Sequence, residues 1–220
     1  MLKRIFDLFL ALAAFLLFLP FSILIFFVLK LTGEGEIFYI QRRVGRYGKD
    51  LDLYKFATML KNSSNIGSGN ITLRNDPRVL PFGKILRKTK INEAPQILNV
   101  IKGDLSIVGP RPLTKDHFDM IPEYIRDVTQ KLKPGITGIG SIVFRDEERY
   151  ISDSTKDPND YYREFIAPYK GELEMWYYEN KSFILDIGLV LLTAYMIFFP
   201  SSKVYNIFFR NLPRNSKFNP

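Results

Sequence analysis

The longest hydrophobic run in the chain lies near its start and predicts a membrane-embedded helix. Residues Leu8–Leu29 contain no charged side chain and consist mainly of Leu, Phe, Ile and Ala. As a straight helix they would rise about 33 Å, which matches a hydrocarbon layer of about 30 Å. A single-pass anchor is therefore the first interpretation. No small-x-small cleavage site follows the run, which disfavours a cleaved signal peptide.

Pro20 and the flanking charges favour a different path for this segment. Proline inside a helix removes one amide donor and clashes with the preceding turn, so a kink or break is expected at Pro20. Positive side chains prefer the cytoplasmic side, and they flank both ends of the run, with Lys3 before it and Lys30 after it. A first arm that ends at Leu19 would rise only about 18 Å, too little to cross. We therefore favour, by a small margin, a re-entrant hairpin over residues 1–31.

The rest of the chain alternates short apolar and polar segments, which predicts a mixed α/β fold that is mostly helical. Gly45–Lys49 supplies the turn of a predicted hairpin, and Gly103 ends a predicted helix that Asn92 opens as its N-cap. The glycines of PGITGIG lack the spacing of a dinucleotide-binding fingerprint and are interpreted as a turn. The predicted strands are Ile37–Val44 and Asp50–Met59, and the predicted helices are Phe82–Thr89, Asn92–Lys102, Asp116–Leu132 and one or two within Asp157–Asn180.

A second apolar run, Ile187–Phe199, lies toward the end of the chain. It has thirteen residues, too few to span a bilayer, and favours a buried or interfacial helix that lies along the membrane. Residues 32–200 are then one small cytoplasmic domain, and residues 201–220 form a basic C-terminal tail. This organisation fixes the domain to the bilayer near both of its ends.

Composition adds a basic charge to this picture. Lys and Arg outnumber Asp and Glu by 31 − 23, which gives a formal net charge of +8. Such a balance suits anionic partners, namely phospholipid headgroups, phosphorylated substrates or nucleic acid. No recognition-helix or aromatic stacking motif supports nucleic acid, so we expect no nucleic-acid partner. The absence of cysteine excludes disulfides, thiolate catalysis and cysteine-ligated zinc.

Cations with interspersed acids in the middle of the chain indicate binding of a diphosphate. A divalent metal bridging the phosphates, with Lys and Arg holding the remaining oxygens, would use such a mixture. Free amides and the positive dipole at the helix start, near Asn92 and Glu93, also favour phosphate. For each residue alone, a solvated basic face, an N-cap or a first-turn charge is the commoner role. The cations that enter this argument are Lys55, Arg74, Arg78, Arg87, Lys88, Lys90 and Arg111, and the interspersed acids are Asp76, Glu93 and Asp104.

The segment Gly109–Pro112, with the sequence GPRP, presents one guanidinium on a rigid loop. Two prolines fix the backbone around Arg111, so its planar fork would be aimed in advance at a phosphate or carboxylate. A structural turn explains the same residues equally well.

The stretch Phe82–Pro112, FGKILRKTKINEAPQILNVIKGDLSIVGPRP, closely resembles the bacterial sugar transferase family, the monotopic polyprenyl-phosphate phosphoglycosyl transferases. The resemblance covers nearly the whole chain in the family's order, so it is more specific than a single motif. Its other parts are QRRVG at Gln41–Gly45, YKFATM at Tyr54–Met59, DPR at Asp76–Arg78, PGITG at Pro134–Gly138 and ENKSFILDI at Glu179–Ile187.

The resemblance implies both an architecture and an activity. The architecture is a re-entrant helix-break-helix over residues 1–31, embedded in one leaflet, with membrane-surface helices and a catalytic domain over residues 32–200. The activity is transfer of sugar-1-phosphate from a UDP-sugar to polyprenyl (undecaprenyl) phosphate, with release of UMP, as the first step of surface polysaccharide or glycan assembly. The expected location is the cytoplasmic face of the bacterial inner membrane, with the phospholipid bilayer as a partner. A homodimer remains open.

The resemblance also implies roles for individual residues. In the family, an Asp-Glu pair opens the helix after the basic segment. The Asp attacks the diphosphate to form a phosphosugar-enzyme intermediate, and the Glu, here Glu93, helps to hold Mg²⁺. Lys55 and Arg111 are expected to contact phosphates. The other residues expected around the substrate phosphates are Arg78, Arg87, Arg145 and Asp186, where Arg145 stands in SIVFR rather than the family's more familiar QVNGR.

The sequence departs from the family pattern at the nucleophile. Asn92 occupies the position of the family Asp, and a neutral amide cannot form the acyl phosphate that a covalent route requires. Ala57 also stands where a basic residue is usual. Three interpretations of Asn92 stay open: Glu93 as nucleophile or direct transfer, an inactive or engineered relative that still binds, and a working subgroup with a different mechanism.

Overall fold

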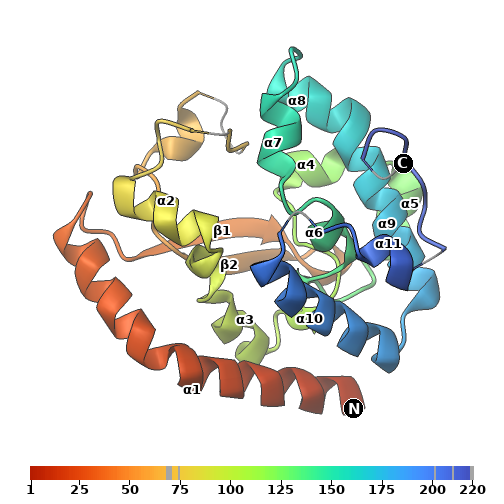
Figure 1. Cartoon of the computed structure of the whole chain (residues 1–220), viewed down its shortest axis with the longest axis horizontal. Coiled ribbons are helices and arrows are strands. Elements are labelled where there is room, and N and C mark those ends of the chain that lie inside the picture. The colour runs from red at the N-terminus through yellow and green to blue at the C-terminus, as the bar shows by residue number, and fades with distance from the viewer. Residues whose placement is uncertain (68–70, 74, 201, 210, 219–220) are drawn as a thin grey trace. The chain divides into compact units, whose positions relative to one another are not determined.

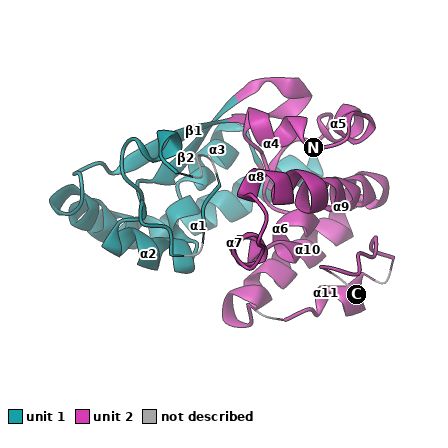
Figure 2. Cartoon of the chain, turned by 90° about the horizontal axis from the view of Figure 1, so that it is seen from above, with its two compact units in different colours: residues 1–42, 51–105 teal, residues 43–50, 106–220 magenta. Residues whose placement is uncertain are grey.

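The computed structural model describes residues 1–67, 71–73, 75–200, 202–209 and 211–218. Figure 1 shows short strands and many helices, which confirms the predicted mixed α/β, mostly helical class. The chain divides into two compact units, drawn in separate colours in Figure 2. Unit 1 comprises Met1–Arg42 and Leu51–Leu105, and unit 2 comprises Arg43–Asp50 and Ser106–Pro220.

Unit 1 contains the long N-terminal helix, most of a β-hairpin and two short helices. Both hairpin strands were predicted, and the chain reverses between them at Gly48, in a backbone conformation with φ +73°. The elements are α1 (Leu2–Leu31), β1 (Phe38–Val44), β2 (Asp50–Phe56), η2 (Ser63–Asn65), α2 (Pro81–Lys88), η3 (Ile91–Glu93) and α3 (Gln96–Lys102), and the hairpin tip η1 (Arg46–Gly48) belongs to unit 2.

Helix α1 bends and is not broken at Pro20. The helix is continuous from Leu2 to Leu31, and Figure 1 shows it bending along its length. Pro20 cannot donate to the carbonyl one turn earlier, and Ser22 Oγ donates to the Leu19 carbonyl at 2.7 Å, a side-chain bond of the kind that bends helices. The expected break in the helix is thus corrected to a bend.

The two arms of α1, before and after Pro20, both pack against the rest of unit 1. In the first arm, the Arg4 guanidinium donates to two backbone carbonyls at the C-terminal end of α3, at 2.6 and 2.8 Å. In the second arm, Leu29 joins a buried hydrophobic cluster with Phe56 of β2 and Leu86 of α2. Burial of these apolar side chains stabilises the contact by roughly 1.5–3 kcal/mol per side chain.

The rest of α1 exposes its apolar side chains. Within the described residues, α1 is the one helix that is long and apolar enough to cross a membrane. Exposed hydrophobic residues follow its whole length, among them Phe9, Leu16, Leu17, Phe21, Leu24 and Phe27. A continuous apolar surface of this size marks contact with lipid or protein, because soluble monomers rarely expose one.

Helix α2 confirms the predicted helix at Phe82–Thr89, whereas the next helix begins later than predicted. Pro81 occupies the first turn of α2, where its missing amide is not needed. Asn92 lies in the 3₁₀ turn η3, so it is not the N-cap of α3, and Pro95 precedes that helix instead. Gly103 ends α3 in a left-handed conformation with φ +98°, as predicted.

Unit 2 is built around two short parallel strands and a set of helices. Its core includes Ile139, Ile166, Leu173 and Leu189, which are fully buried. The elements are β3 (Ser106–Val108), α4 (Lys115–Asp119), α5 (Glu123–Thr129), β4 (Gly135–Thr137), α6 (Ile139–Val143), α7 (Glu147–Ser152), α8 (Pro158–Tyr161), the π-helical segment η4 (Tyr162–Ile166), α9 (Ala167–Asn180), α10 (Phe183–Phe198) and α11 (Tyr205–Phe208).

Strand β4 corrects the prediction of a turn for PGITG. Ser106 pairs with Gly135 and Val108 with Thr137 in a parallel ladder. A Cβ atom on Gly135 would lie 2.2 Å from the Gly109 amide nitrogen, and one on Gly109 would lie 2.3 Å from the Lys133 carbonyl oxygen. Both glycines are therefore required by close backbone approach and not by a turn.

The structure gives two other predicted helices different bounds. The helix predicted at Asp116–Leu132 is divided into α4 and α5. Pro122 interrupts the helical hydrogen bonding and is the N-cap residue of α5. The second apolar run, predicted at Ile187–Phe199, forms α10, which begins earlier because Ser182 caps it by accepting from the Leu185 amide. Of the predicted tail at 201–220, residues 201, 210, 219 and 220 lie outside the described residues.

Candidate active site

Three elements of unit 1 bring Glu93, Lys55 and Gln41 together. Lys55 Nζ on β2 lies 3.9 Å from Glu93 Oε1 on η3 and donates to Gln41 Oε1 on β1 at 3.0 Å. The side chains of Lys55 and Glu93 are 13% and 17% exposed, so water reaches this ion pair only from one side. The structure thus places two of the predicted site residues, Lys55 and Glu93, next to each other.

Local backbone geometry explains why Glu93 faces β2. Lys90 adopts a left-handed conformation with φ +60°, which stops α2 and reverses the chain into η3. Asn99 of α3, fully buried, accepts from the Tyr54 amide at 3.1 Å and donates to the Asp52 carbonyl at 2.8 Å. Its side-chain amide therefore pins α3 to β2 and fixes the distance between Lys55 and Glu93.

Two buried amide side chains at this centre lack partners. Asn92 is 7% exposed, and its Oδ1 atom accepts no hydrogen bond. Gln96, one turn later, is 1% exposed, and its Nε2 atom donates none. Because an unpaired buried polar atom costs about 1–3 kcal/mol, such atoms in a native fold call for water, an ion or a ligand. The position of the family nucleophile is therefore buried, polar and open to a further partner.

Arg78 and Arg87 were predicted to bind phosphate, and the structure gives them different surroundings. Arg87 is half-buried, and one of its Nη atoms approaches Met59 Sδ at 3.7 Å. Arg78 is 4% exposed and pairs with Asp76 at 2.6 Å, and it holds the pKa of that carboxyl below its usual 3.8. The Arg78 guanidinium also donates to the backbone carbonyls of Ser63, Ile66 and Ile71, each at 2.7 Å. This geometry favours a loop-organising role for Arg78.

In unit 2, Arg111 lies on a loop that backbone packing makes rigid. Gly109 precedes it and contacts the backbone around Gly135, as described above. Gly109 N donates to the Thr137 carbonyl at 2.9 Å, and Gly135 N donates to the Pro110 carbonyl at 2.9 Å. These bonds tie the GPRP loop to β4, which supports the prediction that the Arg111 backbone is fixed in advance.

Several charged side chains of unit 2 lie near the loop that carries Arg111. Lys170, which is buried, pairs with Glu147, which is 29% exposed. Burial raises the pKa of Glu147, but the charge and hydrogen bond of Lys170 outweigh burial and leave that pKa lowered. Glu174, 5% exposed, lies near the Arg111 backbone amide, yet no hydrogen bond of ordinary geometry reaches either carboxylate oxygen. Burial raises the pKa of Glu174 to about 7, although the charge of Lys170 opposes this change.

Arg145 and Asp186, the remaining predicted site residues, also belong to unit 2. Arg145 follows α6, and no carboxylate pairs with its guanidinium in the described part of the chain. Burial lowers the pKa of Arg145 from its usual value of 12.5. Asp186 of α10 is buried and accepts from the Tyr177 hydroxyl at 2.6 Å. The structure thus leaves Arg145 available for an anion, whereas Asp186 joins α10 to α9.

The residues of unit 1 suit a magnesium ion that arrives with a diphosphate. Across the residues that the structure describes, no three His, Cys, Asp or Glu side chains gather into a metal cage. Magnesium usually uses one or two protein carboxylates and completes its shell with water and substrate phosphates. Glu93 offers one carboxylate, and the unpaired Oδ1 of Asn92 offers a neutral oxygen.

Sequence reasoning missed several residues that shape these centres. Gln41, Gln96 and Asn99 were not singled out, although Gln96 and Asn99 are polar residues beside apolar neighbours in a predicted helix. That pattern is the one signal that would have marked them as buried polar residues. Glu174 and Lys170 gave no such signal, because they lie in a segment rich in charged and aromatic residues.

The long apolar helix α1 and the Lys55–Glu93 centre fit a membrane-associated enzyme that acts on phosphates, and the comparison with known families agrees. Residues 1–200 match the bacterial sugar transferase family, and the chain belongs to this family. The family assignment made from the sequence motifs is thereby confirmed.

Individual relatives share large parts of the chain. EpsL, an uncharacterized sugar transferase of Bacillus subtilis (strain 168), is 37% identical over 196 residues, which are 88% of this chain and 85% of EpsL. The exopolysaccharide production protein ExoY of Rhizobium meliloti (strain 1021) is 34% identical over 170 residues, 69% of this chain and 73% of ExoY. The UDP-glucose:undecaprenyl-phosphate glucose-1-phosphate transferase of Escherichia coli (strain K12) is 34% identical over 198 residues, 89% of this chain and 40% of that protein.

Proposed function

We propose that this protein transfers sugar-1-phosphate from a UDP-sugar to undecaprenyl phosphate, releases UMP and so initiates assembly of a surface polysaccharide. Membership of the bacterial sugar transferase family carries this proposal. Relatives of known substrate support it, since one from Salmonella typhimurium is an undecaprenyl-phosphate galactose phosphotransferase and is 31% identical over 212 residues. The Lys55–Glu93 centre supplies the groups that such a reaction needs.

Each charged residue has a task in this reaction. Lys55 would neutralise a phosphate oxygen of the diphosphate, and Glu93 would hold Mg²⁺, with Asn92 Oδ1 offering a neutral oxygen. Bound Mg²⁺ supplies charge stabilisation on the phosphate oxygens. Arg111 and Arg145 add guanidinium forks for phosphate, and Arg87 adds a third.

Asn92 favours direct transfer over a covalent intermediate. A phosphate oxygen of the lipid attacks the phosphorus that carries the sugar, and the bond from that phosphorus to the bridging oxygen of UMP breaks. The electron pair leaves with UMP, so no group on the enzyme is phosphorylated. A carboxamide at position 92 is consistent with this route, because it is not a nucleophile for phosphorus.

Helix α1 is proposed to enter one leaflet of the bacterial inner membrane from the cytoplasmic side and return. The ends of a spanning helix lie on opposite sides of the bilayer, whereas Arg4 and Leu29, near the two ends of α1, both contact unit 1. Because the chain has no cysteine, single cysteines at Leu2 and Leu31 can be labelled without background. Both positions should react with an impermeant maleimide in inside-out vesicles only. Reaction of one position from each side would show that α1 spans.

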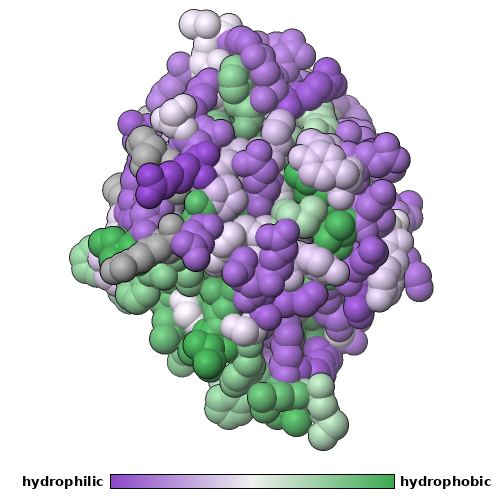
Figure 3. Space-filling view, turned by 90° about the vertical axis from the view of Figure 1, so that its right-hand side faces the viewer, coloured by the Kyte–Doolittle hydropathy of each residue, from purple (hydrophilic) through white to green (hydrophobic). Residues whose placement is uncertain are grey.

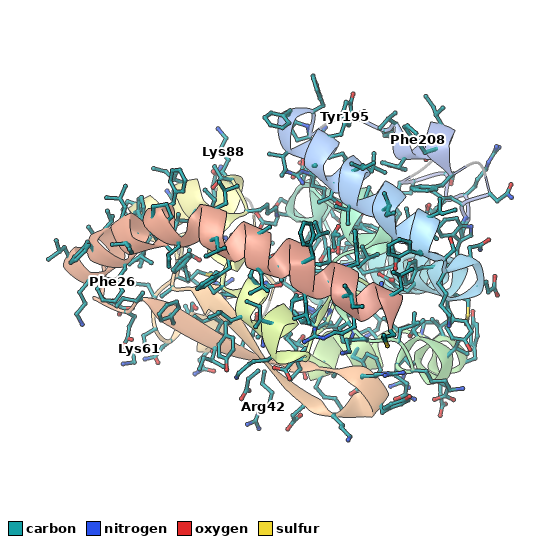
Figure 4. The ribbon with its side chains drawn as sticks, turned by 90° about the horizontal axis from the view of Figure 1, so that it is seen from below. Phe26, Arg42, Lys61, Lys88, Tyr195 and Phe208 are labelled. Carbon is teal, nitrogen blue, oxygen red and sulfur yellow. The ribbon has the colours of Figure 1, made fainter. Side chains whose placement is uncertain are left out.

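Apolar helices of unit 2 are also proposed to contact a membrane surface. Helix α10 exposes Leu191 and Tyr195, and α11 exposes Phe208. Figure 4 shows Tyr195 and Phe208 on the outside of their helices, and Figure 3 shows hydrophobic residues collected toward one edge of a largely hydrophilic face.

The test of the function is UMP release. The purified chain is supplied with magnesium, undecaprenyl phosphate and a panel of UDP-sugars, and UMP and the lipid-linked product are measured. Direct transfer predicts that no UMP appears when the lipid is omitted, whereas a covalent route predicts one equivalent. Absence of UMP and of lipid-linked product for every UDP-sugar would refute the proposal.

Asn92 also supports a second candidate function, that of a non-catalytic membrane protein that binds nucleotide sugar or lipid phosphate. It predicts saturable binding without turnover and a gain of UMP release in Asn92→Asp. A fall in existing UMP release in Asn92→Asp would exclude this second candidate and support a site adapted to the amide.

A further inference from the structure

A basic cavity of about 460 Å³ lies in unit 2, apart from every residue assigned a role above. It is formed by the hairpin tip, the end of α5 and the end of α9. Its lining residues are Arg46, Tyr47, Gln130, Lys131, Tyr178 and Lys181. Three of these six carry a positive charge, two are tyrosines, and among the described lining residues none carries a carboxylate.

The hairpin tip is fastened to the end of α5, so the cavity has a fixed wall. Arg46 Nε donates to the Lys131 carbonyl at 2.8 Å, and Tyr47 N donates to the Gln130 carbonyl at 2.7 Å. Tyr47 adopts a left-handed backbone conformation with φ +59°, which a non-glycine residue rarely does. Strain of this kind persists where surrounding bonds over-determine it, and it often marks a functional site.

The cations of this cavity remain available for an anion. The Arg46 guanidinium lies 4.7 Å from the Tyr47 ring centre, and Lys181 Nζ lies 3.9 Å from the Tyr178 ring centre. In the part of the chain that the structure describes, no ion pair joins Arg46, Lys131 or Lys181 to a carboxylate. The aromatic rings therefore orient two of the positive groups without neutralising them.

A second cavity of unit 2, here called the self-neutralised cavity, also contains cations, but these pair with carboxylates in the same cavity. It measures about 590 Å³ and is lined by Lys156, Asp157, Asp160, Arg163 and Glu164. Lys156 pairs with Glu164, and Arg163 lies 3.8 Å from Asp160. Its two cations thus have carboxylate partners of their own, whereas the three cations of the first cavity have none.

We infer that the Arg46–Lys131–Lys181 cavity binds the phosphate group of a phosphate ester. The Arg46 fork and the two ammonium groups would surround the phosphate oxygens, and the two tyrosines would supply ring faces and hydroxyl groups around the ester. The phosphate has two sources, a phospholipid headgroup or a soluble phosphate compound, and the cavity chemistry is the same for both.

The position of Lys181 favours the lipid source, an argument that rests on the membrane association in the proposed function. Lys181 immediately precedes Ser182, the N-cap of α10. Ile184, in the first turn of α10, is 82% exposed. If α10 lies on the membrane, its first turn places the cavity at headgroup depth, where tyrosine rings and basic residues are favoured.

The experiment titrates the full chain, in neutral detergent, with four probes followed by calorimetry. The probes are short-chain phosphatidylglycerol below its micelle concentration, short-chain phosphatidylcholine, inorganic phosphate and UMP. The test variant combines Lys131→Gln with Lys181→Gln. The matched control combines Lys156→Gln with Arg163→Gln, which removes the same charge from the self-neutralised cavity. Lys181→Arg should restore binding relative to Lys181→Gln.

The expected result is a loss of about tenfold or more in affinity for phosphatidylglycerol in the test variant and less than twofold in the control. Weaker binding of phosphatidylcholine and inorganic phosphate than of phosphatidylglycerol supports the lipid source. Inorganic phosphate or UMP that binds at least as well, with the same dependence on Lys131 and Lys181, supports a soluble source.

Two results would overturn the inference. One is equal weakening in both double variants, which would reflect net charge alone. The other is the absence of binding of all four probes to the parent chain. UMP release measured on the same samples separates this inference from the proposed function, because lost turnover with retained phosphatidylglycerol binding would refute only the latter.

Discussion

Two ion pairs, one in each unit, hold their charges in different ways. In unit 1, Lys55 and Glu93 meet at a loose 3.9 Å, and the amide of Asn92 stays unpaired beside them. In unit 2, Glu147, 29% exposed, forms a close pair with Lys170, which is buried, and the charge of Arg111 acts on Glu147. A loosely paired centre can exchange its internal contacts for a ligand at low cost, whereas breaking a close buried pair costs about 3–5 kcal/mol.

The contrast assigns different work to the two units. The unit 1 centre holds groups that need a further partner, so it is suited to bind the reacting diphosphate and its metal. The Lys170–Glu147 pair neutralises its charges internally. Mutations at the Lys55–Glu93 centre should therefore reduce turnover without unfolding the protein, and mutations of the Lys170–Glu147 pair should first reduce stability.

The largest effect is expected for Glu93→Gln. Loss of the one carboxylate proposed to hold the metal should lower kcat/KM for UMP release by about 10²–10³-fold, because charge stabilisation at the reacting phosphate is lost. The thermal midpoint should stay within a few degrees of the parent value. Glu36→Gln is the matched control, since Glu36 pairs with Lys61 at 2.8 Å on the exposed surface of unit 1. A loss below about threefold in Glu93→Gln would remove Glu93 from the site.

The second prediction concerns two glycines of unit 2. Alanine at Gly135 would place its Cβ 2.2 Å from the backbone nitrogen of Gly109, which cannot move without separating β3 from β4. We expect a loss of about 3 kcal/mol or more, or failure to fold. Alanine at Gly140 would meet Glu174 Oε1 at 2.5 Å, the far end of a flexible side chain. Its loss should be about 1 kcal/mol, and equal thermal midpoints for the two variants would contradict the comparison.

A third comparison separates Arg78 from Arg145. Lysine at position 78 keeps the charge but cannot reach Asp76 and three carbonyls at once, so stability should fall by about 2 kcal/mol while the KM for UDP-sugar is unchanged. Lysine at position 145 should raise that KM about tenfold and leave the thermal midpoint unchanged. The opposite distribution of effects would restore Arg78 as a phosphate ligand.

The sequence predicted those elements whose signals lie in residues close together along the chain. The strands of the hairpin, helix α2 and the end of α3 at Gly103 follow from alternation, Pro81 at a first turn and a glycine stop. The Lys55–Glu93 neighbourhood followed only from the family resemblance. Nothing in the spacing of 38 positions between these two residues indicates that they meet.

Longer-range features could not be predicted from the sequence. Strands β3 and β4 have three residues each, too few for a readable alternation, and the steric reason for Gly109 and Gly135 exists only when the two backbones approach. Asn92 carries the signal of an N-cap, but the left-handed Lys90 turns the chain so that its side chain is buried instead. The burial of Glu174 depends on where α9 packs against α6, which no local pattern states.

The smallest expected effect is in the parent chain itself, because two buried groups of unit 2 titrate in opposite senses and their effects oppose each other. Burial raises the pKa of Glu174 to about 7 from 4.5, so its contribution to stability is present below pH 4.5 and is lost as pH rises through 7. Burial lowers the pKa of His117 to about 4 from 6.5, so its contribution is present above pH 6.5 and is lost as pH falls through 4. Each of these pKa differences changes the free energy of unfolding by at most about 3 kcal/mol.

Between pH 4.5 and 6.5 the two trends cancel, so the thermal midpoint of the parent chain should change little there. Glu174→Gln removes the loss on the alkaline side, and its midpoint should exceed that of the parent by more at pH 8 than at pH 5. His117→Asn removes the loss on the acid side, and its advantage over the parent should be larger at pH 4.5 than at pH 7. Glu147, Lys170, Arg43 and Asp116 act on His117, and Lys170 and Arg111 act on Glu174. Midpoint differences that do not vary with pH in either variant would show that these groups are hydrated in solution, and unit 2 would then resemble unit 1 in leaving its polar groups open.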